Sequence, residues 1–322
     1  MKALVYKGPE TLAYEDAADP APMDGAPVIS VESVGICGSD MHAYLGHDER
    51  RPAPLILGHE VAGLRGDSGA RVTINPLVTC GTCRYCREGR DNLCTTRQII
   101  SMPPREGGFA EMVSLPERNL VPVPDHVTPD QAALAEPIAC GWHAVRMARA
   151  AGAAGPALVI GGGAIGVGAA LSLKAQGIAD VTLVEPNAVR SAYLKDRAEF
   201  EVTTPDAVPA DGRFNIVIDG VGIEPTRAQA SALVAPGGVI VHIGLGSSAG
   251  GLDIRRMTLQ EISFIGTYTY TAQDFRDTAA AMFDGRLGIL DWVETRPLSD
   301  GARAFADIRS GAVAAPKIIL KP

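Results

Sequence analysis

The chain has 322 residues, of which 46% are hydrophobic and 20% are charged, and its formal net charge at pH 7 is -8. This length predicts about two domains of about 150 residues, each large enough to bury a core. The acidic balance leaves no excess of positive charge to neutralise a phosphate backbone or an anionic lipid surface, so we expect neither nucleic acid nor membrane as a partner.

The N-terminal segment reads MKALVYKGPETLAYED and lacks an apolar run followed by a small-residue cleavage site. We therefore expect no signal peptide and a cytoplasmic location. Residues 150–173 carry no charge and are long enough to cross a bilayer. They also contain Pro156 and several glycines in a strand-to-turn-to-helix pattern, which argues against a transmembrane helix.

Residues 1–136 contain short β-branched runs separated by clusters of Gly, Pro and Asp. This texture is typical of an irregular, β-rich domain. The runs are ALVY, PVISVESVGI, RVTI, AEMVSL and LVPVP.

Four of the six cysteines lie in the stretch CGTCRYCREGRDNLC, residues 80–94. In a reducing compartment, clustered cysteines bind metal more often than they form disulfides. The spacing predicts a closed tetrahedral zinc site that braces a loop and leaves no position for a substrate. Disulfides, an iron–sulfur cluster and a nucleic-acid zinc ribbon are weaker alternatives, since the final spacing is long and the surroundings are not basic. The expected ligands are Cys80, Cys83, Cys86 and Cys94.

Residues 138–272 alternate strand-like and helical patterns, which predicts βαβ units and a parallel, doubly wound sheet. The stretch ALVIGGGAIGVG places Gly161, Gly163 and Gly166 in a GxGxxG between a strand and a helix. The first glycine permits the tight turn, the second lets the backbone approach a pyrophosphate, and the third lets helix and strand pack closely. The pattern favours a dinucleotide site over a turn that only packs.

Glu185 ends the next strand, where a carboxylate accepts hydrogen bonds from the adenosine ribose and repels a 2'-phosphate. We therefore expect NAD as the cofactor in preference to NADP. Arg190 is either a residue that stacks on the adenine or a solvated helix cation. The residues expected at the cofactor are Gly161, Gly163, Ala164, Ile165, Gly166, Glu185, Arg190, Val221 and Gly244.

The tail beyond residue 272 has two helical patterns and a closing strand PKIILK, and periodicity does not assign it to either domain. The GxGxxG, the four-cysteine loop and the stretches GICGSDMH and GHEVAG together resemble the zinc-containing medium-chain alcohol dehydrogenase family, particularly its polyol and threonine dehydrogenase branch. The resemblance runs from the first strand to the last. It implies an α/β protein with a GroES-like β-barrel catalytic domain, residues 1–137 and 273–322, and a Rossmann NAD-binding domain, residues 138–272.

The resemblance also implies two zinc ions, one catalytic and one structural. Cys37 and His59 match the first two ligands of the catalytic zinc, and Glu60 and Glu136 match acidic positions of which one or both would complete the set. Three protein ligands leave one position open, where a divalent metal lowers the pKa of a bound hydroxyl.

Ser39 matches the family's hydroxyl that takes the alcohol proton, and His42 matches the histidine that passes it on, a role that suits an imidazole. The resemblance implies hydride exchange between NAD and a secondary alcohol, such as a polyol or sugar alcohol, and its ketone, in a homodimer or homotetramer. Sorbitol dehydrogenases carry an Arg-Tyr pair where this chain has Thr269 and Tyr270, so sorbitol itself is disfavoured. A threonine dehydrogenase-like or carbonyl-reducing enzyme and a non-catalytic NAD-binding protein remain as rival functions.

Overall fold

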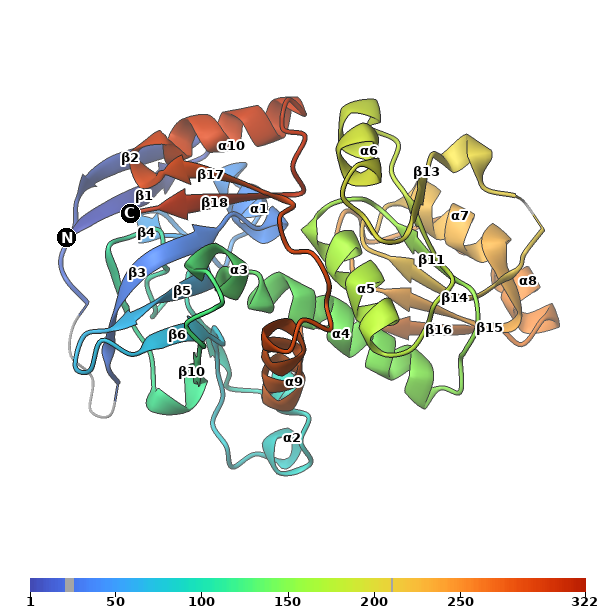
Figure 1. Ribbon diagram of the computed structural model, residues 1–322, viewed down its shortest axis with the longest axis horizontal. Helices are drawn as coiled ribbons and strands as arrows, with labels where there is room; N and C mark the ends of the chain where they lie inside the picture. The colour runs from blue at the N-terminus through green and yellow to red at the C-terminus, as the bar shows by residue number, and fades with distance from the viewer. Residues whose placement is uncertain (21–25, 210) are drawn as a thin grey trace. The chain divides into compact units, whose positions relative to one another are not determined.

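The structure is a computed structural model that describes every residue except 21–25 and 210. Helices and strands alternate along most of the chain, which confirms the predicted α/β class (Figure 1). None of the helices in the described part of the chain is both long enough and apolar enough to cross a membrane.

The chain forms two compact units, here called unit 1 and unit 2. Unit 1 comprises Met1–Glu136, Thr271–Phe283 and Val293–Pro322. Unit 2 comprises Pro137–Tyr270 and Asp284–Trp292. The chain therefore passes from unit 1 to unit 2 and back twice.

Unit 1 is built around an irregular β-barrel. Among the described residues, one sheet has the strand order β10-β6-β5-β3-β18-β17, with β9 also paired to β3, and a smaller sheet has the order β2-β1-β4. The segment 109–111 joins the two sheets, because Phe109 O accepts a hydrogen bond from Leu4 N and Glu111 O accepts one from Val31 N. The strands are β1 (Lys2–Gly8), β2 (Thr11–Asp16), β3 (Val28–Gly35), β4 (Leu55–Ile56), β5 (Glu60–Arg65), β6 (Arg71–Ile74), β7 (Leu77–Val78), β8 (Gln98–Ile99), β9 (Met112–Ser114), β10 (Leu120–Pro122), β17 (Val293–Pro297) and β18 (Lys317–Lys321).

The helices of unit 1 pack on this barrel or follow its strands. Phe305 of α10 contacts the rings of Tyr44 and Phe109, at centroid distances of 5.2 and 5.9 Å. Full burial of one such ring contributes about 1.5–3 kcal/mol to stability. The helices are α1 (Gly38–Tyr44), α2 (Arg84–Arg87), α3 (Pro129–Ala133), α9 (Ala272–Phe283) and α10 (Gly301–Ser310).

The closing strand β18 belongs to unit 1, where it pairs antiparallel with β3 and parallel with β17. This pairing places the part of the tail that periodicity could not assign. Residues 284–292, which the sequence grouped with the same tail, lie instead in unit 2. They are held there because Trp292 is buried and Asp291 O accepts a hydrogen bond from the Tyr193 hydroxyl.

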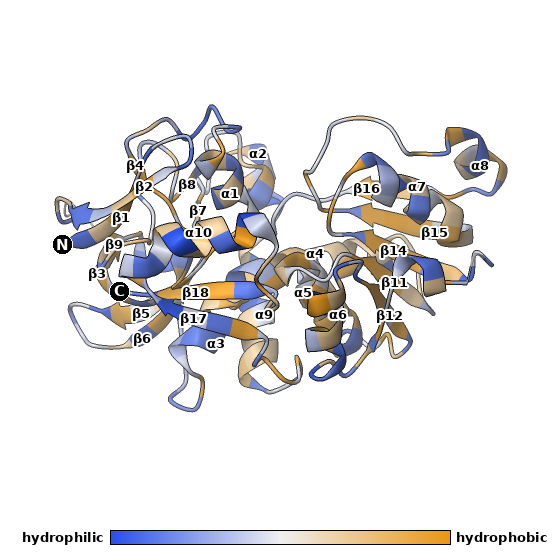
Figure 2. Cartoon of the chain, turned by 90° about the horizontal axis from the view of Figure 1, so that it is seen from above, coloured by the Kyte–Doolittle hydropathy of each residue, from blue (hydrophilic) through white to orange (hydrophobic). Residues whose placement is uncertain are grey.

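Unit 2 is a six-stranded parallel sheet with helices, in the order β13-β12-β11-β14-β15-β16 for its described residues. The chain builds outward from β11 to one edge and then from β14 to the other, which confirms the predicted doubly wound Rossmann arrangement. The central strands are apolar along their length, as Figure 2 shows by colour. The elements are α4 (Ala135–Ala150, which begins in unit 1), β11 (Ala157–Ile160), α5 (Ala164–Ala175), β12 (Val181–Val184), α6 (Ala188–Lys195), β13 (Glu201–Thr203), β14 (Phe214–Asp219), α7 (Glu224–Leu233), β15 (Val234–His242), α8 (Ile254–Leu259) and β16 (Ser263–Gly266).

Candidate active site

Cys37 lies where β3 ends and α1 begins. It is the N-terminal cap residue of α1 and has an extended backbone, with φ -96° and ψ 155°. The carboxylate of Asp40, in the first turn of α1, accepts a hydrogen bond from Cys37 N at 3.0 Å and another from Gly58 N at 3.2 Å. Asp40 therefore fixes the thiol-bearing turn relative to the chain segment that leads into β5.

His59 and Glu60 enter the site from the start of β5. The Nδ1 atom of buried His59 lies 3.3 Å from Asp40 Oδ1 and 3.4 Å from Ser101 Oγ. Burial opposes a charge on this ring, yet the negative charges of Asp40 and Cys37 outweigh burial and raise the pKa of His59 well above its ordinary value. A metal binds the neutral imidazole, so metal binding and protonation of His59 compete.

Glu60 is fully buried, and its two carboxylate oxygens have different surroundings. Oε1 accepts a hydrogen bond from Lys317 Nζ at 2.6 Å, whereas Oε2 has no hydrogen-bond partner. Lys317 also donates to the carbonyl of Ile36 at 2.7 Å. Burial lowers the pKa of Lys317, but the charges of Glu60 and Cys37 outweigh it, and the net effect is a raised pKa.

The ligand atoms of Cys37, His59 and Glu60 all lie within 4.8 Å of one another. A thiolate, an imidazole and a carboxylate form a donor set that zinc accepts with one position left open. The unpartnered, buried Oε2 of Glu60 supports this fit, because such an atom is costly unless a hydrogen bond or a cation satisfies it. Glu136 lies in the first turn of α4, is buried, and contributes to the raised pKa of Lys317.

Ser39 and His42 both lie on α1, three residues apart and thus on one face of the helix. Ser39 Oγ is 3.5 Å from His59 Nε2, so it borders the cluster of potential ligands. His42 is exposed, and its ring contacts that of His47 at a centroid distance of 6.2 Å.

Three polar groups around this cluster were missed by the sequence analysis. Asp40 carries a weak local signal, since it follows Cys37 by three residues within GICGSDMH. Ser101 and Lys317 carry no such signal. Ser101 is 42 residues from His59, and Lys317 is 257 residues from Glu60 and reads as part of an ordinary strand.

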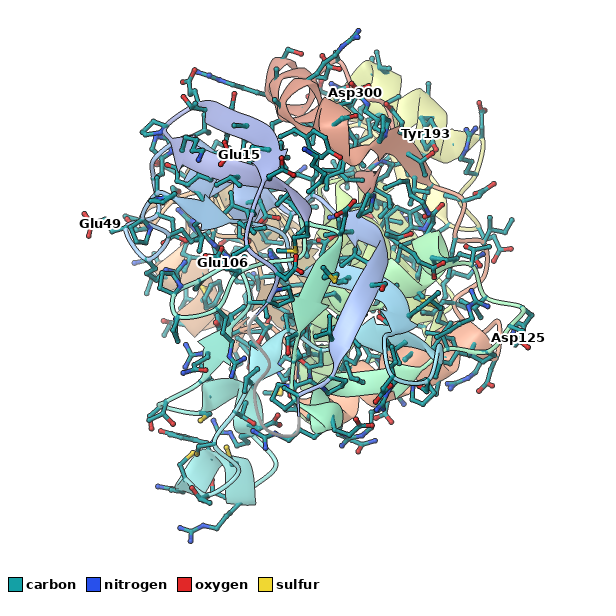
Figure 3. All side chains as sticks on the ribbon, turned by 90° about the vertical axis from the view of Figure 1, so that its left-hand side faces the viewer. Glu15, Glu49, Glu106, Asp125, Tyr193 and Asp300 are labelled. Carbon is teal, nitrogen blue, oxygen red and sulfur yellow. The ribbon has the colours of Figure 1, made fainter. Side chains whose placement is uncertain are left out.

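The second cluster lies in residues 80–94, the segment around α2 that is here called the lobe. Sulfur atoms of this segment are visible in Figure 3. The sulfur atoms of Cys80, Cys83, Cys86 and Cys94 lie within 4.8 Å of one another. All six cysteines are in the described part of the chain, and each is free of disulfide bonds. Four clustered sulfurs fit a closed, tetrahedral zinc site.

Backbone N–H groups of the lobe favour a thiolate at Cys80. Cys80 Sγ accepts hydrogen bonds from Thr82 N at 3.4 Å and Cys83 N at 3.3 Å, and these donors lower the pKa of Cys80 to about 5. Burial and neighbouring thiols raise the pKa of Cys86 to about 12. A metal that binds all four sulfurs as thiolates displaces the thiol protons that the cluster holds in its absence.

The lobe is also linked to α9, within unit 1. Both carboxylate oxygens of Asp91 lie near the first residue of that helix and accept from Ala272 N, at 3.2 and 3.1 Å. A carboxylate at this end of a helix satisfies a free N–H and interacts favourably with the helix dipole.

In unit 2, the GxGxxG follows β11 and opens α5, as predicted. Gly161 has φ +103°, which a residue with a side chain rarely adopts. A Cβ on Gly166 would lie 1.7 Å from Gly161 O, so the turn and the helix pack together only because position 166 has no side chain. Ala164 and Ile165 form the start of α5, where N–H groups are available to an anion.

Glu185 follows β12 directly and is buried. Its Oε2 accepts from Gly162 N at 2.9 Å and its Oε1 accepts from Asn187 N at 2.7 Å. Arg190 Nη1 lies 3.9 Å from Glu185 Oε2. Glu185 therefore holds the glycine-rich turn against the end of β12, a role that the sequence analysis did not identify.

Val221 and Gly244 lie in the loops that follow β14 and β15. Asp219 Oδ1 accepts from Val221 N at 3.0 Å, and a Cβ on Gly244 would lie 2.1 Å from the carbonyl carbon of Val221. The residues expected at the cofactor thus all lie beyond the carboxyl ends of the parallel strands β11, β12, β14 and β15. This is the edge at which doubly wound sheets bind nucleotides.

The two loops are held by Arg227 of α7, whose side chain is buried. Nε donates to Gly250 O at 2.6 Å, and Nη1 donates to Gly222 O and Ser247 O at 3.0 Å each. Nη2 donates to Ser247 Oγ at 2.8 Å and to Ala249 O. Arg227 is a further residue that the sequence analysis missed.

Comparisons with known proteins agree with this geometry. Residues 24–125 match the family model of the alcohol dehydrogenase GroES-like domain, and residues 164–284 match that of the zinc-binding dehydrogenases. L-galactonate-5-dehydrogenase of Escherichia coli (strain K12) is 32% identical over 306 residues, which cover 89% of this chain and 88% of that protein.

Solved structures of similar proteins contain nicotinamide cofactors. Acetophenone reductase from Geotrichum candidum, in complex with NAD, has a TM-score of 0.87 and 26% identity, covering 100% of this chain and 97% of that one. A Sinorhizobium meliloti protein described as a zinc-binding dehydrogenase, bound to NADP, has a TM-score of 0.88 and 25% identity, covering 100% and 99%. The chain belongs to the zinc-containing medium-chain alcohol dehydrogenase family, whose members are oxidoreductases that use zinc and a nicotinamide cofactor.

Proposed function

We propose that this protein transfers hydride between NAD and a secondary alcohol of the polyol or sugar-alcohol class, with zinc at the cluster of Cys37, His59 and Glu60. The observation that carries the proposal is the convergence of these three ligand atoms within 4.8 Å of one another, with His59 and Glu60 buried and one carboxylate oxygen of Glu60 left unpartnered. The name of the relative that acts on L-galactonate, a polyhydroxylated acid, supports a polyhydroxylated substrate.

Cys37, His59 and Glu60 would hold the catalytic zinc, and Glu136 is the additional acidic group proposed to reach it. When bound, the metal supplies Lewis acidity that lowers the pKa of a coordinated hydroxyl. Ser39, which borders the cluster through His59 Nε2, would hold the alcohol proton at its Oγ. His42 lies on the same face of α1 and is exposed, so it would pass that proton to water.

We assign the catalytic role to the GroES-like part, residues 1–137 and 273–322 apart from 284–292, which lie in unit 2, and cofactor binding to residues 138–272. Glu185 supports NAD over NADP, because a carboxylate at the end of β12, fixed by Gly162 N and Asn187 N, would repel a 2'-phosphate. Cys80, Cys83, Cys86 and Cys94 would hold a structural zinc that braces the lobe.

The protein would act as a homodimer or homotetramer in the cytoplasm. Strand β16 lies at an edge of the described sheet of unit 2, and open edges invite pairing with a second chain. Exposed apolar side chains lie on β16, on the helix α8 that precedes it and in the loop after its neighbour β15, in agreement with a covered surface. These side chains are Leu245, Ile254, Leu259 and Phe264. The six cysteines all lie in the described part of the chain and form no disulfide there, in agreement with a reducing compartment.

A second candidate is a carbonyl-reducing enzyme on the same scaffold, which the name of the similar acetophenone reductase supports. A threonine dehydrogenase-like activity is the other alternative within this fold. Assays in both directions with polyols, sugar acids, threonine and simple ketones distinguish the three.

The test of the proposed function follows NADH absorbance with the wild-type protein and Cys37→Ser. We expect the wild type to oxidise at least one polyol or sugar-derived alcohol. The variant should lose hydride transfer and keep NAD binding, which a titration of cofactor fluorescence measures. Full activity of Cys37→Ser would contradict the proposed mechanism, and NAD binding without turnover of any substrate by the wild type would favour a non-catalytic protein.

A further inference from the structure

We propose that Lys317 is a positioning residue for Glu60, and that it occupies one carboxylate oxygen so that Glu60 can offer only the other to a metal. This inference rests on the metal site of the proposed function. Glu60 begins β5, Lys317 begins β18, and β3 lies between these two strands in the sheet. The contact therefore joins parts of the barrel that no local sequence pattern connects.

Both members of the pair are buried. The side chains of Lys317 and Glu60 are 3% and 0% exposed, and Lys317 Nζ lies 2.6 Å from Oε1 of Glu60. Nζ also donates to the carbonyl of Ile36 at 2.7 Å, next to Cys37. Two hydrogen bonds in a dry environment fix the ammonium group, and through it they fix the orientation of the carboxylate.

Gly35 limits the other side of the carboxylate. Gly35 faces Glu60 in the register of β3 and β5, and a Cβ on Gly35 would lie 1.8 Å from Oε2 of Glu60. The carboxylate thus fits between the ammonium group of Lys317 and the bare backbone of Gly35. Its orientation is set by these two contacts, and Oε2 is the oxygen that keeps its lone pairs unused.

The consequence for a bound metal is a single-oxygen ligand. A carboxylate with both oxygens free can bind a cation through both and fill a further coordination position. While Oε1 is held by Lys317, Glu60 supplies one donor, and the position needed by a substrate oxygen stays open.

Lys321 provides a control on the same strand, in an ion pair that is more exposed than that of Lys317. Its Nζ lies 2.6 Å from Asp130 Oδ1 and donates to Ser33 Oγ at 2.9 Å, so it too forms a lysine–carboxylate pair that joins β18 to its neighbours. This pair does not include Glu60. Lys321→Met therefore removes an ion pair from β18 without freeing an oxygen of Glu60.

The experiment loads the full-length protein with Co²⁺ and titrates imidazole, a ligand that binds through one nitrogen. Subtracting the visible spectrum of Cys37→Ser removes the contribution of the four-cysteine lobe. For Lys317→Met we expect Co²⁺ to be retained at least as tightly as in the wild type, a spectrum of higher coordination, and imidazole affinity reduced by about 10- to 100-fold. Lys317→Arg should keep imidazole affinity close to that of the wild type. Lys321→Met should have the spectrum and the imidazole affinity of the wild type.

Two results with Lys317→Met would overturn the inference. An unchanged spectrum and unchanged imidazole affinity would show that Lys317 does not control the carboxylate. Loss of Co²⁺ from this site would show that the lysine only maintains the fold. If Lys317→Met does not fold, Lys317→Gln is measured instead and judged by the same two results. The glutamine side chain is shorter than that of lysine and carries no charge.

Failure of the proposed function is distinguishable from failure of this inference. A wild-type cobalt spectrum that does not depend on Cys37 would contradict the metal site itself. A Cys37-dependent spectrum that is the same in Lys317→Met and wild type would contradict only the role of Lys317.

Discussion

Replacement of Arg227 by methionine should destabilise unit 2 and weaken cofactor binding. The buried guanidinium donates five hydrogen bonds that hold the loops after β14 and β15 together. Methionine keeps an unbranched apolar stem and removes every donor. Hydrogen bonds to a charged group contribute about 1.5–3 kcal/mol each, and the exposed loop 247–250 recovers water for part of its acceptors, so we expect a loss of about 3 kcal/mol.

The chain offers a specific probe for this measurement. Its two tryptophans, Trp142 and Trp292, are both buried and both lie in unit 2. Urea unfolding followed by tryptophan fluorescence therefore reports on that unit. Arg255→Met, which alters an exposed arginine of α8, is the control and should change stability by less than about 0.5 kcal/mol.

The cofactor supplies the second readout. Because the loops held by Arg227 carry Val221 and Gly244, Arg227→Met should raise the dissociation constant for NAD while leaving metal content unchanged. Wild-type stability and wild-type NAD affinity in this variant would refute the reasoning, since they would show that the five hydrogen bonds do not hold the loops.

Three further predictions concern the cofactor, the lobe and pH. Glu185→Ser should raise the ratio of NADP to NAD turnover by about tenfold or more, because it removes a negative charge near the site of a 2'-phosphate; an unchanged ratio would exclude that role. Cys86→Ser should lower bound zinc from about two to about one ion per chain and speed proteolysis of the lobe before it affects hydride transfer; retention of both ions would argue against the four-thiolate site. Hydrogen bonds from Arg65 lower the pKa of Asp67 from its ordinary value to about 2, so the contribution of this exposed carboxylate to stability is fully present above its ordinary pKa and is lost as the pH falls toward 2. The difference in thermal midpoint between wild type and Asp67→Asn should therefore shrink below about pH 4, and a difference that does not vary with pH would contradict this assignment.

The features that the sequence predicted best are those encoded over short distances. The four cysteines lie within fifteen residues, and the GxGxxG lies between one strand and one helix, so local spacing was sufficient for both. Cys37 and His59 are farther apart and become neighbours through the pairing of β3 with β5. Their role was inferred from family resemblance, because spacing alone does not reveal which strands pair.

The features that the sequence missed depend on burial. Arg227 in EPTRAQASAL has the appearance of a surface cation on a helix, and only the folded loops enclose it. Lys317 reads as the start of a β-strand, and its partner Glu60 is in a distant strand. Glu185 was predicted to bind a ribose, but its hydrogen bonds to Gly162 N and Asn187 N depend on tertiary packing of two loops.

The hydrogen bonds between Asp91 and Ala272 N couple metal binding in the four-cysteine lobe to fraying of the first turn of α9. Asp91 lies in the four-cysteine lobe, and Ala272 is the first residue of the helix by which the chain re-enters unit 1. A metal that binds only the ordered lobe lowers the population of opened lobe in proportion to its concentration over its dissociation constant. When the lobe opens less often, the first turn of α9 also frays less often. The rate of amide hydrogen exchange at Ala272 therefore reports the metal occupancy of the lobe.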